Sequence, residues 1–113
     1  MITIYHNPRC RKSREGLALL ENSGKEFEVI RYLEDTPSKE TIERILKLLN
    51  VKPIALIRKN EAIWKAHYKG KALNDEEIVQ AMVDHPKLME RPVVIHQDKA
   101  VIGRPKERIE DIL

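Results

Sequence analysis

The sequence is poor in cysteine and in aromatic residues. Cysteine occurs once in 113 residues, so no disulfide can form within the chain, and we expect the protein in the reducing cytoplasm. Aromatic residues make up 4%, and no nucleic-acid-binding motif is present, so we attribute the net charge of +3 to a solvated surface and expect no nucleic-acid partner. The sequence has no apolar run long enough to span a membrane, so we expect no membrane association. It also lacks the basic and apolar regions of a signal peptide, so we expect no secretion signal.

The remaining composition is typical of one folded domain. Hydrophobic residues make up 42% and charged residues 35%, a balance found in globular proteins rather than in disordered chains. A chain of 113 residues is long enough for one hydrophobic core and too short for two. We therefore predict a single domain over residues 1–113.

The one thiol, Cys10, lies between an apolar, strand-like start at residues 1–5 and a helical pattern. A helix that begins near residue 11 would direct its unpaired backbone N–H groups at the sulfur. Basic residues also flank the cysteine, namely Arg9, Arg11, Lys12 and Arg14. Cations and helix N-termini lower a thiol pKa from its usual value of about 8.5. The pattern therefore favours a reactive thiolate over the alternative, a buried structural cysteine.

The hydrophobic pattern predicts a strand, a helix and a second strand within residues 2–32. The helix ends at residues 22–24, and its narrow apolar face consists of Gly16, Leu17, Leu20 and, at the margin, Ala18. A right-handed crossover would make the two strands parallel. Cys10 would then lie at the carboxyl end of the first strand, where α/β folds bind ligands.

A helical stretch follows. Residues 36–50 form the clearest amphipathic pattern, with Pro37 expected in the first turn of the helix. Residues 53–60 are expected to form a short turn or helix that carries Arg58, and residues 64–71 a polar loop. With the next helix, these segments make up a helical insertion over roughly residues 36–90.

The last third of the chain predicts one more helix and a hairpin. Asn74 and Glu77 match a capping box at the start of a helix that ends near residue 85. Residues 93–95 and 100–102 predict a β-hairpin, and Arg104-Pro105 is expected to open a final short helix.

This order of elements predicts an α/β, thioredoxin-like fold. Its mixed sheet of four strands would combine a parallel pair with a C-terminal antiparallel hairpin, and helices would flank it. Such folds carry a cis-proline beside the active site. Pro92, which follows Arg91 just before the third strand, is the candidate.

Arginines at predicted loops and element edges are candidates for binding an oxyanion. A thiolate that attacks an oxyanion is repelled by it, and further negative charge gathers on oxygen in the transition state; fixed guanidinium groups relieve both problems. The candidates are Arg58, Arg91 and Arg104, although pattern alone favours the alternative of ordinary surface arginines. His67, His85 and His96 are scattered singly without a companion cysteine, so we expect no metal site.

Several short blocks follow one another along nearly the whole chain. They are His6-Asn7-Pro8-x-Cys10 with Ser13-Arg14, Ala55-Leu56-Ile57-Arg58-Lys59-Asn60, His85-Pro86, Glu90-Arg91-Pro92-Val93-Val94 and Gly103-Arg104-Pro105. In this order and spacing the chain resembles the glutaredoxin-coupled arsenate reductase family. The resemblance implies a thioredoxin-like, arsenate reductase-type domain and a thiol-dependent oxidoreductase that reduces arsenate to arsenite.

The resemblance also implies roles for individual residues. In that family the cysteine that matches Cys10 is the nucleophile and forms a covalent adduct with arsenate. Glutathione then attacks as a co-substrate, arsenite leaves, and glutaredoxin removes the mixed disulfide; no bound cofactor is involved. The family's substrate-binding arginines fall on Arg58, Arg91 and Arg104. A chain without a second cysteine suits an external thiol donor.

His6 and Ser13 complete the predicted site. By resemblance, His6 helps to keep the thiol ionised; the alternative is a structural hydrogen-bond donor at a strand end. We predict Ser13 as a further substrate-binding residue. Its hydroxyl would form a hydrogen bond to the sulfur, cap the helix, or do both.

The resemblance is incomplete, and two alternatives stay open. The best-studied reductases have a Gly-Thr pair in place of Arg11-Lys12 and continue beyond the position of Leu113. The bulky basic pair would either tighten anion binding or block the backbone N–H groups that hold the oxyanion. The first alternative is a glutathione-dependent thiol-disulfide oxidoreductase that acts on an organic disulfide. The second is a redox regulator of the Spx type that binds RNA polymerase, although Ser13 replaces the second cysteine of the C-x-x-C pair of those regulators.

Overall fold

The computed structural model describes all 113 residues, which divide into two compact units. The first unit consists of Met1–Asp35 and Arg91–Leu113, and the second of Thr36–Glu90. The second unit thus coincides with the stretch expected to be a helical insertion. None of the helices has both the length and the hydrophobicity needed to span a bilayer.

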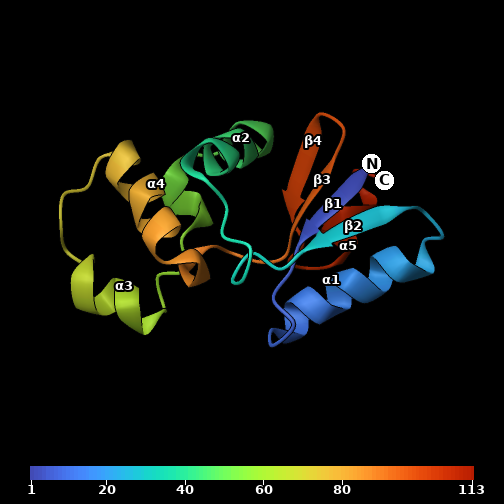
Figure 1. Cartoon of the computed structure of the whole chain (residues 1–113), viewed down its shortest axis with the longest axis horizontal. Helices are drawn as coiled ribbons and strands as arrows, with labels where there is room; N and C mark the ends of the chain where they lie inside the picture. The colour runs from blue at the N-terminus through green and yellow to red at the C-terminus, as the bar shows by residue number, and fades with distance from the viewer. The chain divides into compact units, whose positions relative to one another are not determined.

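The first unit is built on a four-stranded sheet with the order β2-β1-β3-β4 (Figure 1). Its elements are β1 (Ile2–Tyr5), α1 (Arg11–Asn22), β2 (Phe27–Ile30), β3 (Val93–His96), β4 (Lys99–Ile102) and α5 (Glu107–Glu110). β1 is parallel to β2 and antiparallel to β3, and β3 is antiparallel to β4. The thioredoxin-like fold class, with a parallel pair and an antiparallel C-terminal hairpin, is confirmed.

One face of this sheet forms a core with α1 and α5. Ile4 of β1 is aligned with Val94 of β3, and both are fully buried. Leu20 of α1 and Ile109 of α5 join them in the same cluster. Each such side chain contributes about 1.5–3 kcal/mol by its burial, so this cluster fixes both helices to the sheet.

The sequence of α1 explains its orientation. The residues that it buries, Ser13, Gly16 and Leu20, recur at helical spacing and face the sheet. Ala18, which was expected at the margin of this face, is exposed instead. The helix ends where the N–H of Ser23 donates to the carbonyl of Leu20, and Gly24 follows with a positive φ of 75°.

Two glycines allow the backbone to approach Pro92 closely. A Cβ added to Gly16 would lie 2.9 Å from Pro92 Cγ, and one added to Gly103 would lie 3.0 Å from the same atom. Ile109 Cδ1 would also lie in close contact with the Cβ added at either glycine. The Arg91–Pro92 peptide bond is cis, and so is the Arg104–Pro105 bond, which the sequence analysis did not single out.

The second unit is helical. It contains α2 (Lys39–Leu49), the 3₁₀ turn η1 (Pro53–Leu56), α3 (Ala62–His67), α4 (Asp75–Asp84) and the 3₁₀ turn η2 (Pro86–Leu88). α2 packs against α4 through apolar faces that hold Ile42 and Ile45 on one side and Ile78 and Met82 on the other. The predicted capping box is confirmed, since Asn74 and Glu77 exchange both hydrogen bonds.

The structure corrects three local expectations. Residues 64–71 are not wholly a polar loop, because α3 covers their first part and Trp64 is buried and stacks on Tyr68 at 5.3 Å. Pro37 precedes the N-cap residue Ser38 rather than lying in the first turn of α2. Pro105 does not open α5 directly, since it accepts a hydrogen bond from Arg108 in a turn before the helix begins at Glu107.

The glycine contacts lead to a stability prediction. Gly16→Ala should lower the free energy of unfolding by about 1–3 kcal/mol, because the new methyl group collides with Pro92 and Ile109. Helix propensity alone would give a gain of about 1 kcal/mol. Urea denaturation measures the difference, with Asn22→Ala on exposed helix surface as the control. A Gly16→Ala protein at least as stable as wild type would show that the close approach is unimportant.

Candidate active site

Cys10 occupies the N-cap position of α1 and is half-buried. Its N–H donates to the carbonyl of Asn7 at 3.0 Å, and its own carbonyl accepts from the N–H of Arg14 at 3.0 Å. The side chain of Asn7 accepts from the N–H of Arg9 at 3.0 Å, in the local turn that asparagine favours. The guanidinium of Arg14 donates to the carbonyl of Pro8 at 3.0 Å. The loop that carries the sulfur is therefore held by hydrogen bonds at both ends.

The sulfur receives hydrogen bonds that favour its negative form. Burial raises the pKa of the Cys10 thiol, but the side chain of Arg91 and the backbone N–H groups of Ser13 and Lys12 lower it. The net effect is a pKa below the ordinary thiol value. Cys10 thus lies at the N-terminus of α1, as predicted, and the backbone of the first turn contributes to the lowered pKa.

The cations next to Cys10 in sequence are not the main cause of this shift. Arg11 and Lys12 both pair with Glu15 on the next turn of α1, at 3.4 and 3.7 Å, and the Arg11 side chain is 83% exposed. Arg14 is engaged with the loop carbonyl described above. The expected lowering of the pKa is present, but its leading cation is Arg91, far away in sequence.

Arg104 also approaches the sulfur of Cys10. Its Nη1 atom is 3.9 Å from Cys10 Sγ and 3.4 Å from the carbonyl oxygen of Arg91. The two arginines precede the two cis-prolines, and the N–H of Gly103 donates to the carbonyl of Pro92 at 2.8 Å. The loops before β3 and after β4 thus place two guanidinium groups at one thiol.

His6 contacts Ser13 rather than Cys10. Its Nδ1 atom lies 2.6 Å from Ser13 Oγ, and both side chains are buried. The same hydroxyl accepts from the N–H of Asn7 at 3.0 Å. Burial, followed by the nearby Arg31, lowers the pKa of His6, so the ring is neutral at pH 7. His6 therefore contacts the first turn of α1 through Ser13, and its part in keeping the thiol ionised stays a prediction.

Arg58 belongs to the second unit and not to the unit that contains Cys10. Its guanidinium pairs with Glu61 at 3.5 Å and with Glu90 at 3.4 Å, and its N–H donates to the carbonyl of Leu88 at 2.7 Å. Two carboxylates thus hold this half-buried arginine. Its part in substrate binding stays a prediction.

The comparisons with known proteins agree on one family. The family model described as "ArsC family" matches residues 5–112. The chain belongs to the ArsC family. It is 46% identical to the uncharacterized protein YfgD of Escherichia coli K12, over 99% of this chain and 96% of that protein. It is 40% identical to an arsenate reductase of Haemophilus influenzae, over 99% and 98% of the two chains. A solved arsenate reductase structure from Vibrio cholerae superimposes with a TM-score of 0.94 at 45% identity, over 99% of this chain and 97% of that one.

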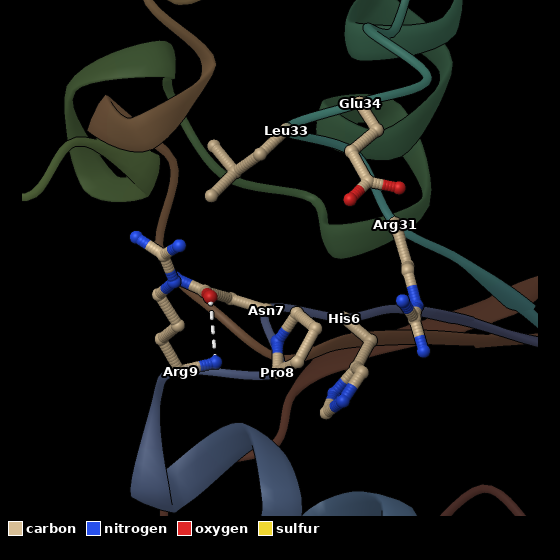
Figure 2. A pocket seen from close by; sticks show the side chains of 7 residues that line it. All are labelled: His6, Asn7, Pro8, Arg9, Arg31, Leu33 and Glu34. Carbon is tan, nitrogen blue, oxygen red and sulfur yellow. Dashed lines mark hydrogen bonds between the residues drawn. The ribbon is translucent and has the colours of Figure 1, made fainter.

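Sequence reasoning missed one feature of this ArsC-family site, a cavity beside the cysteine loop (Figure 2). The cavity has a volume of about 430 Å³ and is lined by His6, Asn7, Pro8, Arg9, Arg31, Leu33 and Glu34. Its walls are the segments that follow β1 and β2. The predicted parallel pair of strands could have indicated this cavity, because the carboxyl ends of parallel strands meet at one edge of the sheet, where ligands bind.

The structure offers no cluster for a metal ion. No group of three or more His, Cys, Asp or Glu side chains is arranged to hold one. His85 instead meets Tyr68 edge-on at 6.2 Å between ring centres, and His96 Nδ1 lies 2.6 Å from the carbonyl of Ile112.

The role of Arg91 can be measured through the thiol itself. Replacing Arg91 with glutamine removes a hydrogen bond and a positive charge from the sulfur, so the pKa of Cys10 should rise. A smaller thiolate fraction at pH 7 should slow alkylation by iodoacetamide several-fold, and the rate-against-pH curve should move to higher pH. Arg108→Gln, at an exposed position of α5, is the control. An unchanged curve would remove Arg91 from the stabilisation of the thiolate.

Proposed function

We propose that this protein is an arsenate reductase in which Cys10 is the nucleophile. The observation that carries the proposal is a thiol with a lowered pKa, held at the N-terminus of α1 near Arg91 and Arg104. Relatives named arsenate reductases, 38–40% identical over nearly their whole length, support the choice of substrate. By the resemblance described above, Cys10 corresponds to the family's nucleophile, and Arg91 and Arg104 to two of its substrate-binding arginines.

Binding of the oxyanion is the first task of the site. Arsenate carries negative charge that repels a thiolate, and this repulsion is offset where guanidinium groups hold the oxygens. Arg91 and Arg104 each offer several N–H donors near the sulfur, and α1 begins directly after Cys10 with unpaired backbone N–H groups. We assign substrate binding to these groups, with Arg58 as a further candidate.

The proposed covalent step uses the thiolate and the donors near it. The Cys10 thiolate forms a bond to arsenic, and one arsenate oxygen leaves as water after protonation. Glutathione then forms a disulfide bond with the Cys10 sulfur. The S–As bond breaks, and its electron pair stays on arsenic, which is thereby reduced from As(V) to As(III) and leaves as arsenite. The two sulfur atoms together lose the two electrons that arsenic gains.

Regeneration requires an outside thiol. Cys10 is the only cysteine of the chain, so no internal thiol can attack the Cys10–glutathione disulfide. We propose glutaredoxin as the partner that attacks the glutathione sulfur and releases the Cys10 thiolate. The lowered pKa assists this step, since a stable thiolate is a better leaving group.

A glutathione-dependent reductase of organic disulfides is the second candidate. The charged cavity beside the cysteine loop favours it, because an organic disulfide needs more room than an arsenate ion. The regulator alternative has less support. Ser13, at the position of the second cysteine of that motif, is buried and bonded to His6.

The nucleophile is tested by Cys10→Ser. Purified wild-type protein with arsenate, glutathione and glutaredoxin should form arsenite, and the variant should lose this activity by more than about a thousandfold, since a serine hydroxyl is not ionised at pH 7. Arsenite is quantified after chromatographic separation from arsenate. Wild-type rates in the variant would remove Cys10 from the mechanism.

The arginine clamp is tested by Arg91→Lys. Lysine keeps the charge but cannot bond two oxygens through a planar fork, so KM for arsenate should rise about tenfold or more. The matched control, Arg108→Lys, should leave KM unchanged. If Arg91→Lys also leaves KM unchanged, bidentate binding by this arginine is wrong.

A further inference from the structure

The cavity beside the cysteine loop holds charges of both signs that are not neutralised within the protein. Arg9, Arg31 and Glu34 line it, and none of their side chains forms an ion pair. The N–H of Glu34 donates to the carbonyl of Arg31 at 3.0 Å, so both belong to one ordered turn after β2. A cavity with unpaired charges offers binding partners to a charged ligand.

The charges have a definite arrangement. Figure 2 shows Arg9 on one side of the cavity, and Arg31 and Glu34 on the other. One end thus offers a single cation, and the other offers a cation and an anion together. A ligand that complements this pattern carries a lone carboxylate at one end and an ammonium group with a second carboxylate at the other.

The cavity adjoins the loop that carries the reactive thiol. Arg9, which lines the cavity, is the residue directly before Cys10. The lining segments follow the carboxyl ends of the parallel strands β1 and β2, the edge at which α/β sheets bind ligands. The volume of about 430 Å³ falls in the range of small-molecule sites.

We propose that this cavity is the binding site for the thiol co-substrate, a tripeptide thiol with the charge pattern of glutathione. This inference rests on the proposed function, which requires an external thiol at Cys10. The glycine carboxylate of glutathione binds to Arg9, and the γ-glutamyl end binds with its carboxylate to Arg31 and with its ammonium group to Glu34. The cysteinyl part, with its sulfur, lies between the two ends.

The affinity follows from the exposure of these groups. Arg9, Arg31 and Glu34 are all exposed side chains, so water and salt screen each contact. We expect a dissociation constant on the order of 1 mM at low salt, and weaker binding as salt is added. The cavity should not increase the affinity for thiols that lack charged ends.

Binding is tested with S-methylglutathione, which cannot form a disulfide. Titrated into ¹⁵N-labelled wild-type protein at pH 7.5, it should shift the amide signals of His6, Asn7, Arg9 and residues 31–34. Arg31→Gln and Glu34→Gln should each weaken binding about three- to tenfold, and the control Arg44→Gln, on the exposed face of α2, should not. Equal affinities in all variants, or shifts confined to other residues, would overturn the proposal.

The assignment of the two ends is tested by shortening the ligand. S-methyl-γ-glutamylcysteine lacks the glycine and its carboxylate, so it should bind the wild type several-fold more weakly than S-methylglutathione. In Arg9→Gln the two compounds should bind equally, because the partner of that carboxylate is gone. If the loss on shortening is the same in both proteins, Arg9 does not bind the glycine carboxylate.

Turnover assays separate this proposal from the proposed function. If arsenate is reduced but KM for glutathione is the same in wild type and Arg31→Gln, the cavity assignment fails and the function stands. If S-methylglutathione binding depends on Arg31 and Glu34 but no arsenite forms, the cavity assignment stands and the arsenate proposal fails. With 2-mercaptoethanol as the thiol, Arg31→Gln should match the wild type.

Discussion

The packing of α1 on Pro92 controls the geometry of the candidate site. Gly16 lets the helix approach the proline ring to a distance at which no side chain would fit. Cys10 begins this helix, and Arg91 directly precedes the proline, so the same contact sets the position of the sulfur relative to the guanidinium group. Electrostatic stabilisation depends on that position, and partial burial increases its strength. The packing contact between Gly16 and Pro92, two uncharged residues, thus influences the ionisation of the Cys10 thiol.

Charge around the sulfur is divided between local and distant groups. The basic residues of the first turn of α1 are largely occupied, since Arg11 and Lys12 share Glu15. His6 has a lowered pKa and contacts Ser13 rather than the sulfur. The positive potential at the thiolate therefore comes from the helix N-terminus and from the arginines next to the cis-prolines.

Sequence reasoning succeeded where a local pattern carried the information. The strand, helix and strand before residue 32, and the capping box at Asn74, depend on neighbours within a few positions, and the structure confirms them. α3 was missed because it is short and has no capping side chain, and Trp64 alone gives no periodic signal. The lowered pKa of Cys10 was predicted in direction but assigned to the wrong cations, because sequence cannot show that Arg11 turns to Glu15. The charged cavity requires two loops to meet, which no single stretch of sequence specifies.

The partly exposed thiolate has a cost outside its proposed reaction. The ionised form of cysteine is also the form that peroxides attack, and its first oxidation product is a sulfenic acid. Within this chain no second sulfur exists that could trap that product as a disulfide before it is oxidised irreversibly. Survival of Cys10 under oxidative stress therefore depends on how quickly a small thiol reaches it and caps it.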